Sequence, residues 1–257
     1  MMRVGFVGTG KIAGAMVHGL ADQGHAIRVS PRSARRAADL AARFAEVQVA
    51  ENAEIVAGSD VVIVSLMADA AGHVLPDLPW RSDQIVVSVM AGVARDALAV
   101  MCAPATRITL MIPLPSVATG GCPLPVFPAC DAVGTLFGAR NAVLPVDSEA
   151  ALNAHFLVAG TAAPILRMLA EITDWLATET GDAVAAEAYV SGLFTGFLAP
   201  DGSGQHFVGM MAELATQGGL NATLRAALEA ADTPAMLRAA MDDLRPRLDL
   251  PAAPGAQ

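Results

Sequence analysis

A glycine-rich turn near the start of the chain constrains the fold more than any other feature. Arg3–Val7 is a short apolar run typical of a buried strand, and Gly8, Gly10 and Ala13 follow it in a G-x-G-x-x-G/A pattern. The first glycine permits a tight turn, the second lets the backbone approach a ligand, and the small third residue lets a helix pack closely on the strand. The first-turn amides of that helix are expected to face the phosphates of a dinucleotide. These amides belong to Lys11, Ile12 and Ala13.

The surroundings of the turn support this interpretation. Apolar residues recur at helical spacing at Ile12, Met16 and Leu20, and a second strand over Ala26–Val29 leads to Ser30. A strand–helix–strand unit of about 30 residues is the size expected for a nucleotide-binding motif. The alternative is a structural turn in an α/β domain that binds no nucleotide.

The residues after the second strand indicate which dinucleotide binds. A site for NAD usually has Asp or Glu there, about 20 residues beyond the glycines, to hold the ribose 2′-hydroxyl. This chain has Ser30, Arg32 and Ser33 with no carboxylate among them, a combination that suits a 2′-phosphate. We therefore expect NADP(H) as the cofactor. Arg35 and Arg36 either extend the phosphate site or solvate the outer face of a helix.

Charge and cysteine content argue against nucleic acid and metal as partners. The net charge of −9 lacks the basic balance that nucleic-acid binding normally needs. The cysteines Cys102, Cys122 and Cys130 are an odd number without paired metal spacing, and no two histidines have ligand spacing on one helix. We expect a reducing compartment and no metal site.

The apolar composition, 54% of the chain, raises the question of a membrane span. The apolar runs 156–166 and 188–200 are shorter than the roughly 18 residues that a span requires, so we expect buried helices there. The chain enters its first strand at once, which leaves no room for a secretory signal. We expect no membrane association and cytoplasmic residence.

Strands and helices alternate over the first half of the chain. Continuous β-branched runs at residues 60–65 and 84–89 predict parallel strands covered on both faces. The other elements expected are a helix over about 70–78, strands over 107–112 and 143–146, and loops or edge strands over the proline-rich residues 113–128.

After residue 147 the pattern changes to helices rich in alanine and leucine, without strands. We expect an α/β fold with an N-terminal Rossmann-type parallel-sheet domain over residues 1–148 that binds NADP. An all-helical substrate and dimerisation domain is expected over 149–257. Its helices 161–177 and 184–198 are apolar around much of their circumference, which predicts a homodimer through this domain.

Several of these segments, in order and at matching spacing, resemble pyrroline-5-carboxylate reductase. They are residues 4–20, the Ser-Pro-Arg-Ser turn at 30–33, residues 60–66 and residues 86–92. Three further segments are similar more loosely. Residues 107–121, 156–164 and 216–221 stand where the family has R-V-M-P-N-T-P-A, S-G-S-G-P-A-Y and S-P-G-G-T-T.

The resemblance implies a cytoplasmic enzyme of proline biosynthesis that passes hydride from NADPH to the carbon of a cyclic imine carrying a carboxylate. It also implies an active site shared by two chains. Ser65, Leu66, Ala91 and Gly92 would join the glycine turn in binding the cofactor.

The same resemblance assigns the substrate residues. Gly218 and Gly219, followed by a helix over Leu220–Ala230, would hold the substrate carboxylate through backbone amides. Leu220 and Asn221 complete this set, and Thr161 is expected to supply a catalytic hydroxyl donor.

Departures from the family keep other functions open. Leu220 and Asn221 replace two threonines, and Met67 stands where the family usually has lysine, so a related reductase of another imine or ketone is one alternative. A catalytically silent, NADP-binding regulatory protein is another. β-Hydroxyacid dehydrogenases share the domain plan but need a catalytic lysine in the second half, and Lys11 is the only lysine here.

Overall fold

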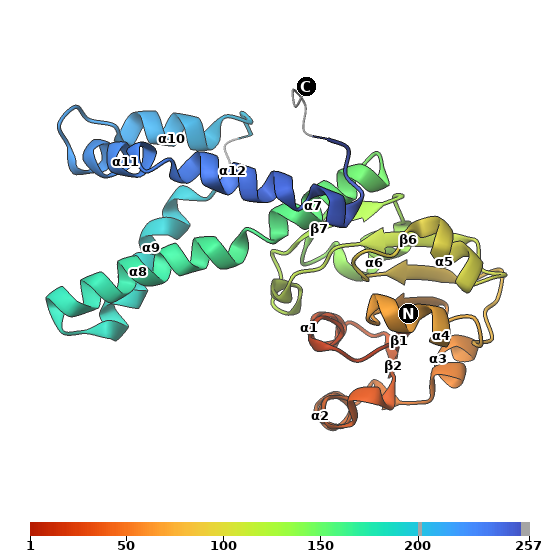
Figure 1. Ribbon diagram of the computed structural model, residues 1–257. Coiled ribbons are helices and arrows are strands. Elements are labelled where there is room, and N and C mark those ends of the chain that lie inside the picture. The colour runs from red at the N-terminus through yellow and green to blue at the C-terminus, as the bar shows by residue number, and fades with distance from the viewer. Residues whose placement is uncertain (200–201, 253–257) are drawn as a thin grey trace. The chain divides into compact units, whose positions relative to one another are not determined.

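The computed structural model describes residues 1–199 and 202–252 and divides into two compact units (Figure 1). The first contains Met1–Phe156 and Arg247–Leu250, and the second contains Leu157–Pro246 with the described residues that follow Leu250. The division falls inside helix α7 (Glu149–Ala159), slightly beyond the boundary expected after residue 148. The start of α7 belongs to the first unit because Leu152 packs in its core and Glu149 accepts a hydrogen bond from the Arg95 amide.

The first unit is built on an eight-stranded sheet with the order β3-β2-β1-β4-β5-β6-β7-β8. The strands are β1 (Arg3–Val7), β2 (Ala26–Val29), β3 (Val47–Val49), β4 (Val61–Val64), β5 (Ile85–Ser88), β6 (Arg107–Met111), β7 (Pro123–Phe127) and β8 (Ala142–Pro145). Strands β1 to β6 pair in parallel, β7 is antiparallel to β6, and β8 is parallel to β7. This arrangement confirms the Rossmann-type sheet.

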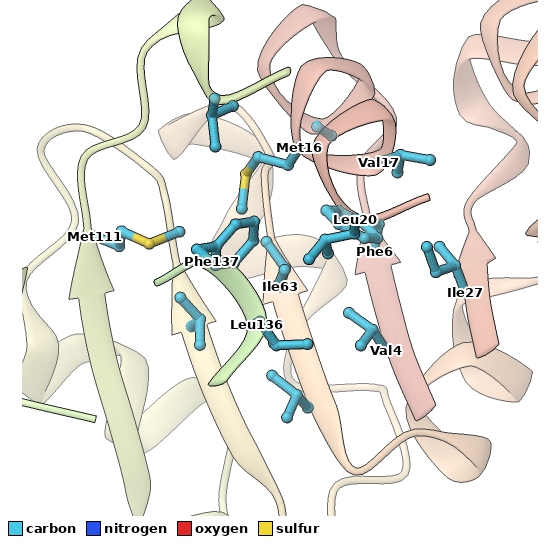
Figure 2. Close-up of a cluster of buried hydrophobic side chains, with 14 of the residues drawn as sticks. Val4, Phe6, Met16, Val17, Leu20, Ile27, Ile63, Met111, Leu136 and Phe137 are labelled. Atoms are coloured by element: carbon cyan, nitrogen blue, oxygen red, sulfur yellow. The ribbon is translucent and has the colours of Figure 1, made fainter. Parts of the chain in front are cut away.

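Helices cover both faces of the sheet and bury a separate apolar cluster on each. They are α1 (Lys11–Leu20), α2 (Ala34–Arg43), α3 (Asn52–Gly58), α4 (Ala68–Val74), α5 (Arg95–Met101) and α6 (Asp131–Phe137). Figure 2 shows one cluster, in which Val4 and Phe6 of β1 meet Met16 of α1 and Phe137 of α6. Val7 lies in the other cluster, as the alternation of side chains along a strand requires.

The proline-rich segment differs from the expectation of loops and edge strands. Strand β7 lies inside the sheet, between β6 and β8, and most of its residues are buried. The two prolines are tolerated because their carbonyls can still accept hydrogen bonds: the Ile112 amide donates to Pro125 O at 3.1 Å. The absence of a proline N–H therefore does not exclude an interior strand here.

The second unit is helical throughout its described residues, in agreement with the predicted fold class. Its elements are α8 (Ala162–Thr180), α9 (Ala183–Phe197), α10 (His206–Leu214), α11 (Leu220–Ala230) and α12 (Thr233–Asp243), with a 3₁₀ turn at Arg245–Leu248 that leads into the first unit. Gly181 ends α8 in the left-handed conformation, with φ of 73°. Asp182 caps α9 by accepting the Ala185 amide at 3.0 Å.

One helical segment, Glu149–Thr180, is long and apolar enough to cross a membrane by length and composition alone. The expectation concerned the uninterrupted apolar runs 156–166 and 188–200, whereas this segment continues through charged residues such as Arg167. Only 6% of its most apolar window is buried within the single chain, which differs from the buried helix expected there. A single segment of this kind is weak evidence for a span, because helices of soluble proteins pass the same test.

Candidate functional site

The glycine turn follows β1 and adopts the conformation that its sequence predicts. Gly8 has φ of 97°, and a Cβ atom added to it would overlap the Ser65 carbonyl, so only glycine fits. Gly10, the N-cap of α1, has φ of −77°, and an added Cβ would meet no atom within 4 Å. Gly8 is therefore required by the packing of the turn, whereas the absence of a side chain at Gly10 leaves free space in front of the turn.

The start of α1 is open to a ligand. No side chain caps this helix, and its first turn holds no acidic residue. The amides of Lys11, Ile12 and Ala13 therefore carry the partial positive charge of a helix N-terminus without an internal acceptor. The Ala13 side chain is fully buried, as close packing of the helix on β1 requires.

Ser30 has a structural role that sequence reasoning missed. Its side chain is 1% exposed, its Oγ accepts the Gly8 amide at 2.9 Å, and Thr9 Oγ1 donates to its carbonyl at 2.7 Å. The hydroxyl thus fastens the glycine turn to the end of β2. The structure shows Ser30 holding the turn, and its contact with a cofactor stays a prediction.

Arginines gather beside the turn, at the start of α2. Arg32 and Arg35 are exposed, and neither has a hydrogen bond or ion pair within the described part of the chain. Ser33 is half-buried and lines a shallow hollow with Arg35, Arg36 and Asp39. Cations at a helix N-terminus oppose the helix dipole, and the first turn of α2 holds no acid to offset them. An anion bound here would relieve this repulsion.

The other predicted cofactor residues lie at the carboxyl ends of β4 and β5. Ser65 and Leu66 follow β4 directly, and the Ser65 amide donates to Val7 O at 2.9 Å, next to the glycine turn. Ala91 and Gly92 follow β5 and are exposed, with φ of 72° at Gly92. The strand order changes direction between β1 and β4, which is where open α/β sheets bind their ligands. The structure thus brings the predicted residues of this unit to one edge of the sheet.

The predicted substrate residues lie in the second unit, at the start of α11. Gly218 has φ of 74°, Gly219 is the N-cap, and no side chain caps the helix. The Gly219 amide already donates to Thr216 O at 2.9 Å, so the free donors are the amides of the first helical turn. Leu220 is 85% exposed and Asn221 is also exposed.

Thr161 precedes α8 and its hydroxyl donates to the Val158 carbonyl at 2.7 Å. The proton that the predicted catalytic role requires is therefore engaged in this conformation. Sequence spacing alone gave no sign of this local hydrogen bond, which is common for threonine at helix boundaries.

The structure defines the surroundings of three other side chains that could take part in catalysis. Burial raises the pKa of the Cys102 thiol to about 12, so it stays protonated at neutral pH. The imidazole of His155 hydrogen-bonds to Ala151 O, and that of His206 to Phe197 O, each at 2.8 Å. Across residues 1–199 and 202–252, no group of three or more His, Cys, Asp or Glu side chains could hold a metal ion.

Comparison with known proteins agrees with this architecture. Residues 3–92 match the family described as NADP oxidoreductase coenzyme F420-dependent. Over 171 residues the chain is 32% identical to pyrroline-5-carboxylate reductase of Pseudomonas aeruginosa, covering 62% of this chain and 63% of that relative. The structure of 1-pyrroline-5-carboxylate reductase from Streptococcus pyogenes matches with a TM-score of 0.81 at 18% identity, over 96% of this chain and 98% of that one. Pyrroline carboxylate reductase of Plasmodium falciparum, with NADP bound, matches with a TM-score of 0.80 at 16% identity, over 94% and 95%.

The chain is similar in sequence to a pyrroline-5-carboxylate reductase over part of its length, and it shares the fold of two solved reductases of that name. The sequence match spans less than two thirds of the curated relative, and the structures agree in fold. Two positions that depart from the reductase pattern are exposed in the structure. Leu220 and Met67, which replace polar residues of the family pattern, are 85% and 71% exposed, so both are available to shape a site.

Proposed function

We propose that the protein is an NADPH-dependent reductase that transfers hydride to the carbon of a small cyclic imine carrying a carboxylate, with pyrroline-5-carboxylate as the substrate of choice. The observation that carries this proposal is the glycine turn. The space in front of Gly10 holds no protein atom within 4 Å of an added Cβ, and Arg32 and Arg35 near the turn have no partner within the described residues. Similarity to a pyrroline-5-carboxylate reductase and to an NADP-oxidoreductase family model supports the reaction class.

The residues of the first unit fit NADP(H). A pyrophosphate needs close backbone approach and free amides, which Gly10 and the first turn of α1 offer. A 2′-phosphate needs cations and no carboxylate, and Arg32 and Ser33 meet that need after β2. We propose that Ser65, Leu66, Ala91 and Gly92 line the nicotinamide end.

This reaction asks little of acidic or basic side chains. Bound NADPH supplies the hydride. A cyclic imine is readily protonated at nitrogen, so its carbon is already electrophilic and the main task of the chain is to fix distance and orientation. The first-turn amides of α11 would hold the substrate carboxylate, and Asn221 would add a side-chain amide. The Thr161 hydroxyl donates its hydrogen bond to Val158 O. In this conformation it can therefore serve the substrate only as a hydrogen-bond acceptor.

A different imine or ketone is the second candidate. Leu220 and Asn221 take the places of two hydroxyl residues in the family pattern, and Leu220 adds apolar surface where the substrate carboxylate is expected. An apolar residue there favours a substrate with an uncharged group in place of the carboxylate. A catalytically silent protein that binds NADP is the third, because the fold does not establish chemistry.

A spectroscopic assay separates these candidates. NADPH oxidation should depend on added pyrroline-5-carboxylate and be at least about tenfold faster than NADH oxidation, as expected from a charge-assisted phosphate contact. Preference for 1-pyrroline, which lacks the carboxylate, would favour the second candidate. NADPH binding without reduction of any cyclic imine or ketone would contradict the reductase proposal and favour the silent protein.

The helical unit supports a homodimer. Helix α8 has no buried residue, and in the described part of this unit only Leu157, Ala186 and Val190 are buried apolar side chains. Exposed apolar side chains on α8 to α11 include Leu166, Ile172, Trp175, Tyr189, Phe207 and Leu224. So much exposed apolar surface is unusual for a monomer and is typical of an obligate interface. We propose that a second copy of the chain covers it and completes the active site.

Sedimentation should therefore find a dimer at micromolar concentration. Trp175→Glu, at a side chain that is 67% exposed in the single chain, should raise the dimer dissociation constant by about a hundredfold, the value of one large apolar group left unburied. Val100→Asp, on α5 of the other unit at 79% exposure, is the matched control and should stay dimeric. A folded wild-type monomer at that concentration would disprove the dimer.

A further inference from the structure

The side chain of Arg36 reaches from α2 to the glycine turn. Its Nη1 donates a hydrogen bond to the Thr9 carbonyl oxygen at 3.2 Å. Its Cδ lies 3.1 Å from the place where a Cβ on Gly14 would stand, so the aliphatic stem packs closely on α1. Among the described residues, Arg36 is the arginine near the turn that donates a hydrogen bond to it, and it is half-buried.

Helix stability does not explain a cation at this position. Arg36 lies in the first turn of α2, where a positive charge opposes the helix dipole. No carboxylate pairs with its guanidinium within the described residues. The placement is explained by its partner, the Thr9 carbonyl.

The Thr9–Gly10 peptide connects the Arg36 hydrogen bond to the proposed dinucleotide site. The peptide is trans, so its C=O and N–H point in opposite directions. Holding the Thr9 carbonyl toward Arg36 therefore aims the Gly10 N–H away from α2. Within the described residues this N–H has no acceptor, and Ser30 fastens the preceding residues through the Gly8 amide and the Thr9 hydroxyl.

We infer that Arg36 is a positioning residue, which orients the Gly10 N–H toward the pyrophosphate of the dinucleotide. Arg36 therefore affects the binding of the pyrophosphate, which NADPH and NADH share. Arg32, which has no partner in the described structure, acts instead on the 2′-phosphate that distinguishes them. This division of roles rests on the proposed dinucleotide site and does not depend on the identity of the imine.

Binding measurements on two variants test the inference. Arg36→Met keeps the aliphatic stem on Gly14 and removes the donor, whereas Arg32→Ala removes the exposed cation. The probes are NADPH, NADH, ADP, which carries the pyrophosphate, and adenosine 2′-monophosphate, which carries only the 2′-phosphate. Titration calorimetry gives each dissociation constant, and the thermal midpoint of each variant reports folding.

Arg36→Met should weaken NADPH, NADH and ADP by a similar factor of about ten, the loss expected for one misaligned hydrogen bond to a phosphate, and leave adenosine 2′-monophosphate unchanged. Arg32→Ala should weaken NADPH and adenosine 2′-monophosphate by about ten- to a hundredfold and spare NADH and ADP. Arg36→Lys, which retains a donor, should recover part of the lost affinity and serves if the methionine variant does not fold.

Three results would overturn the inference. Weaker binding of adenosine 2′-monophosphate to Arg36→Met would make Arg36 a direct ligand of the 2′-phosphate. Unchanged ADP and NADH binding would give it no role at the pyrophosphate. Failure of the wild-type protein to bind any of the four probes would remove the dinucleotide site itself, while binding without imine reduction would contradict only the proposed reaction.

Discussion

Replacing Gly10 by alanine should weaken NADPH binding by at least about a hundredfold and leave the fold intact. The backbone at Gly10 has φ of −77°, which alanine adopts freely, and the added Cβ would meet no protein atom within 4 Å. A methyl group there takes up the space that the pyrophosphate needs. Overpacking costs about 1–3 kcal/mol, and losing an amide contact to a charged group adds about 1.5–3 kcal/mol, so affinity should fall at least about a hundredfold.

The stability of this variant should change by less than about 1 kcal/mol. Alanine is a poorer N-cap than glycine, but it also lowers the entropy of the unfolded chain, and the two effects oppose each other. Calorimetric titration with NADPH and a thermal melt of the same sample measure both quantities. NADPH affinity within about threefold of wild type would place the pyrophosphate away from this turn.

Gly8→Ala is the matched control, because the same methyl group should act on stability there. Gly8 has φ of 97°, and its new Cβ would overlap the Ser65 carbonyl, a backbone atom that cannot move aside cheaply. Strain of this kind costs about 1–3 kcal/mol, which lowers the melting temperature of a chain of this size by roughly 2–12 °C. The two substitutions in one motif should therefore have different effects: Gly10→Ala should weaken NADPH binding, and Gly8→Ala should lower the stability of the fold.

The elements predicted best from the sequence are those fixed by local patterns. The first strand, helix and second strand needed only apolar periodicity and the glycine turn, and the structure has them at Arg3–Val7, Lys11–Leu20 and Ala26–Val29. The start of α11 at Leu220 likewise follows from two glycines before an apolar pattern. Strand β3 was missed because three residues with two exposed side chains carry too little pattern to recognise.

Contacts between residues that are far apart in the sequence could not be predicted from local sequence patterns. Ser30 was expected to face a phosphate because hydroxyls suit phosphates, yet its oxygen accepts the Gly8 amide 22 positions earlier in the chain. The bond from Arg36 to the Thr9 carbonyl is of the same kind. Neither leaves a signal in spacing or composition, since both depend on how β1 and β2 lie side by side in the sheet.

The proposed substrate end of the site is the start of α11, where Leu220 is the first helical residue and is 85% exposed. A substitution at Gly219 would test this site poorly, because an added Cβ lies 3.0 Å from the Thr216 carbonyl and would disturb the turn itself. A carboxylate introduced at position 220 tests the site without disturbing the turn. It stabilises its own helix N-terminus by about 0.3–1 kcal/mol and so preserves the fold, while competing with the substrate carboxylate for the same amides.

Leu220→Glu should therefore raise KM for pyrroline-5-carboxylate by at least about a hundredfold, because a like charge replaces the attraction of the helix amides, and leave the NADPH dissociation constant unchanged. Leu224→Glu makes the same change one turn further along α11, away from the free amides, and should alter KM far less. Steady-state kinetics with sedimentation of each variant separates a loss of substrate binding from a loss of assembly. Leu220→Thr, which returns a hydroxyl of the family pattern, should act in the opposite direction and lower KM. Wild-type KM in Leu220→Glu would mean that the carboxylate binds elsewhere, since no substrate anion could share those amides with a fixed glutamate.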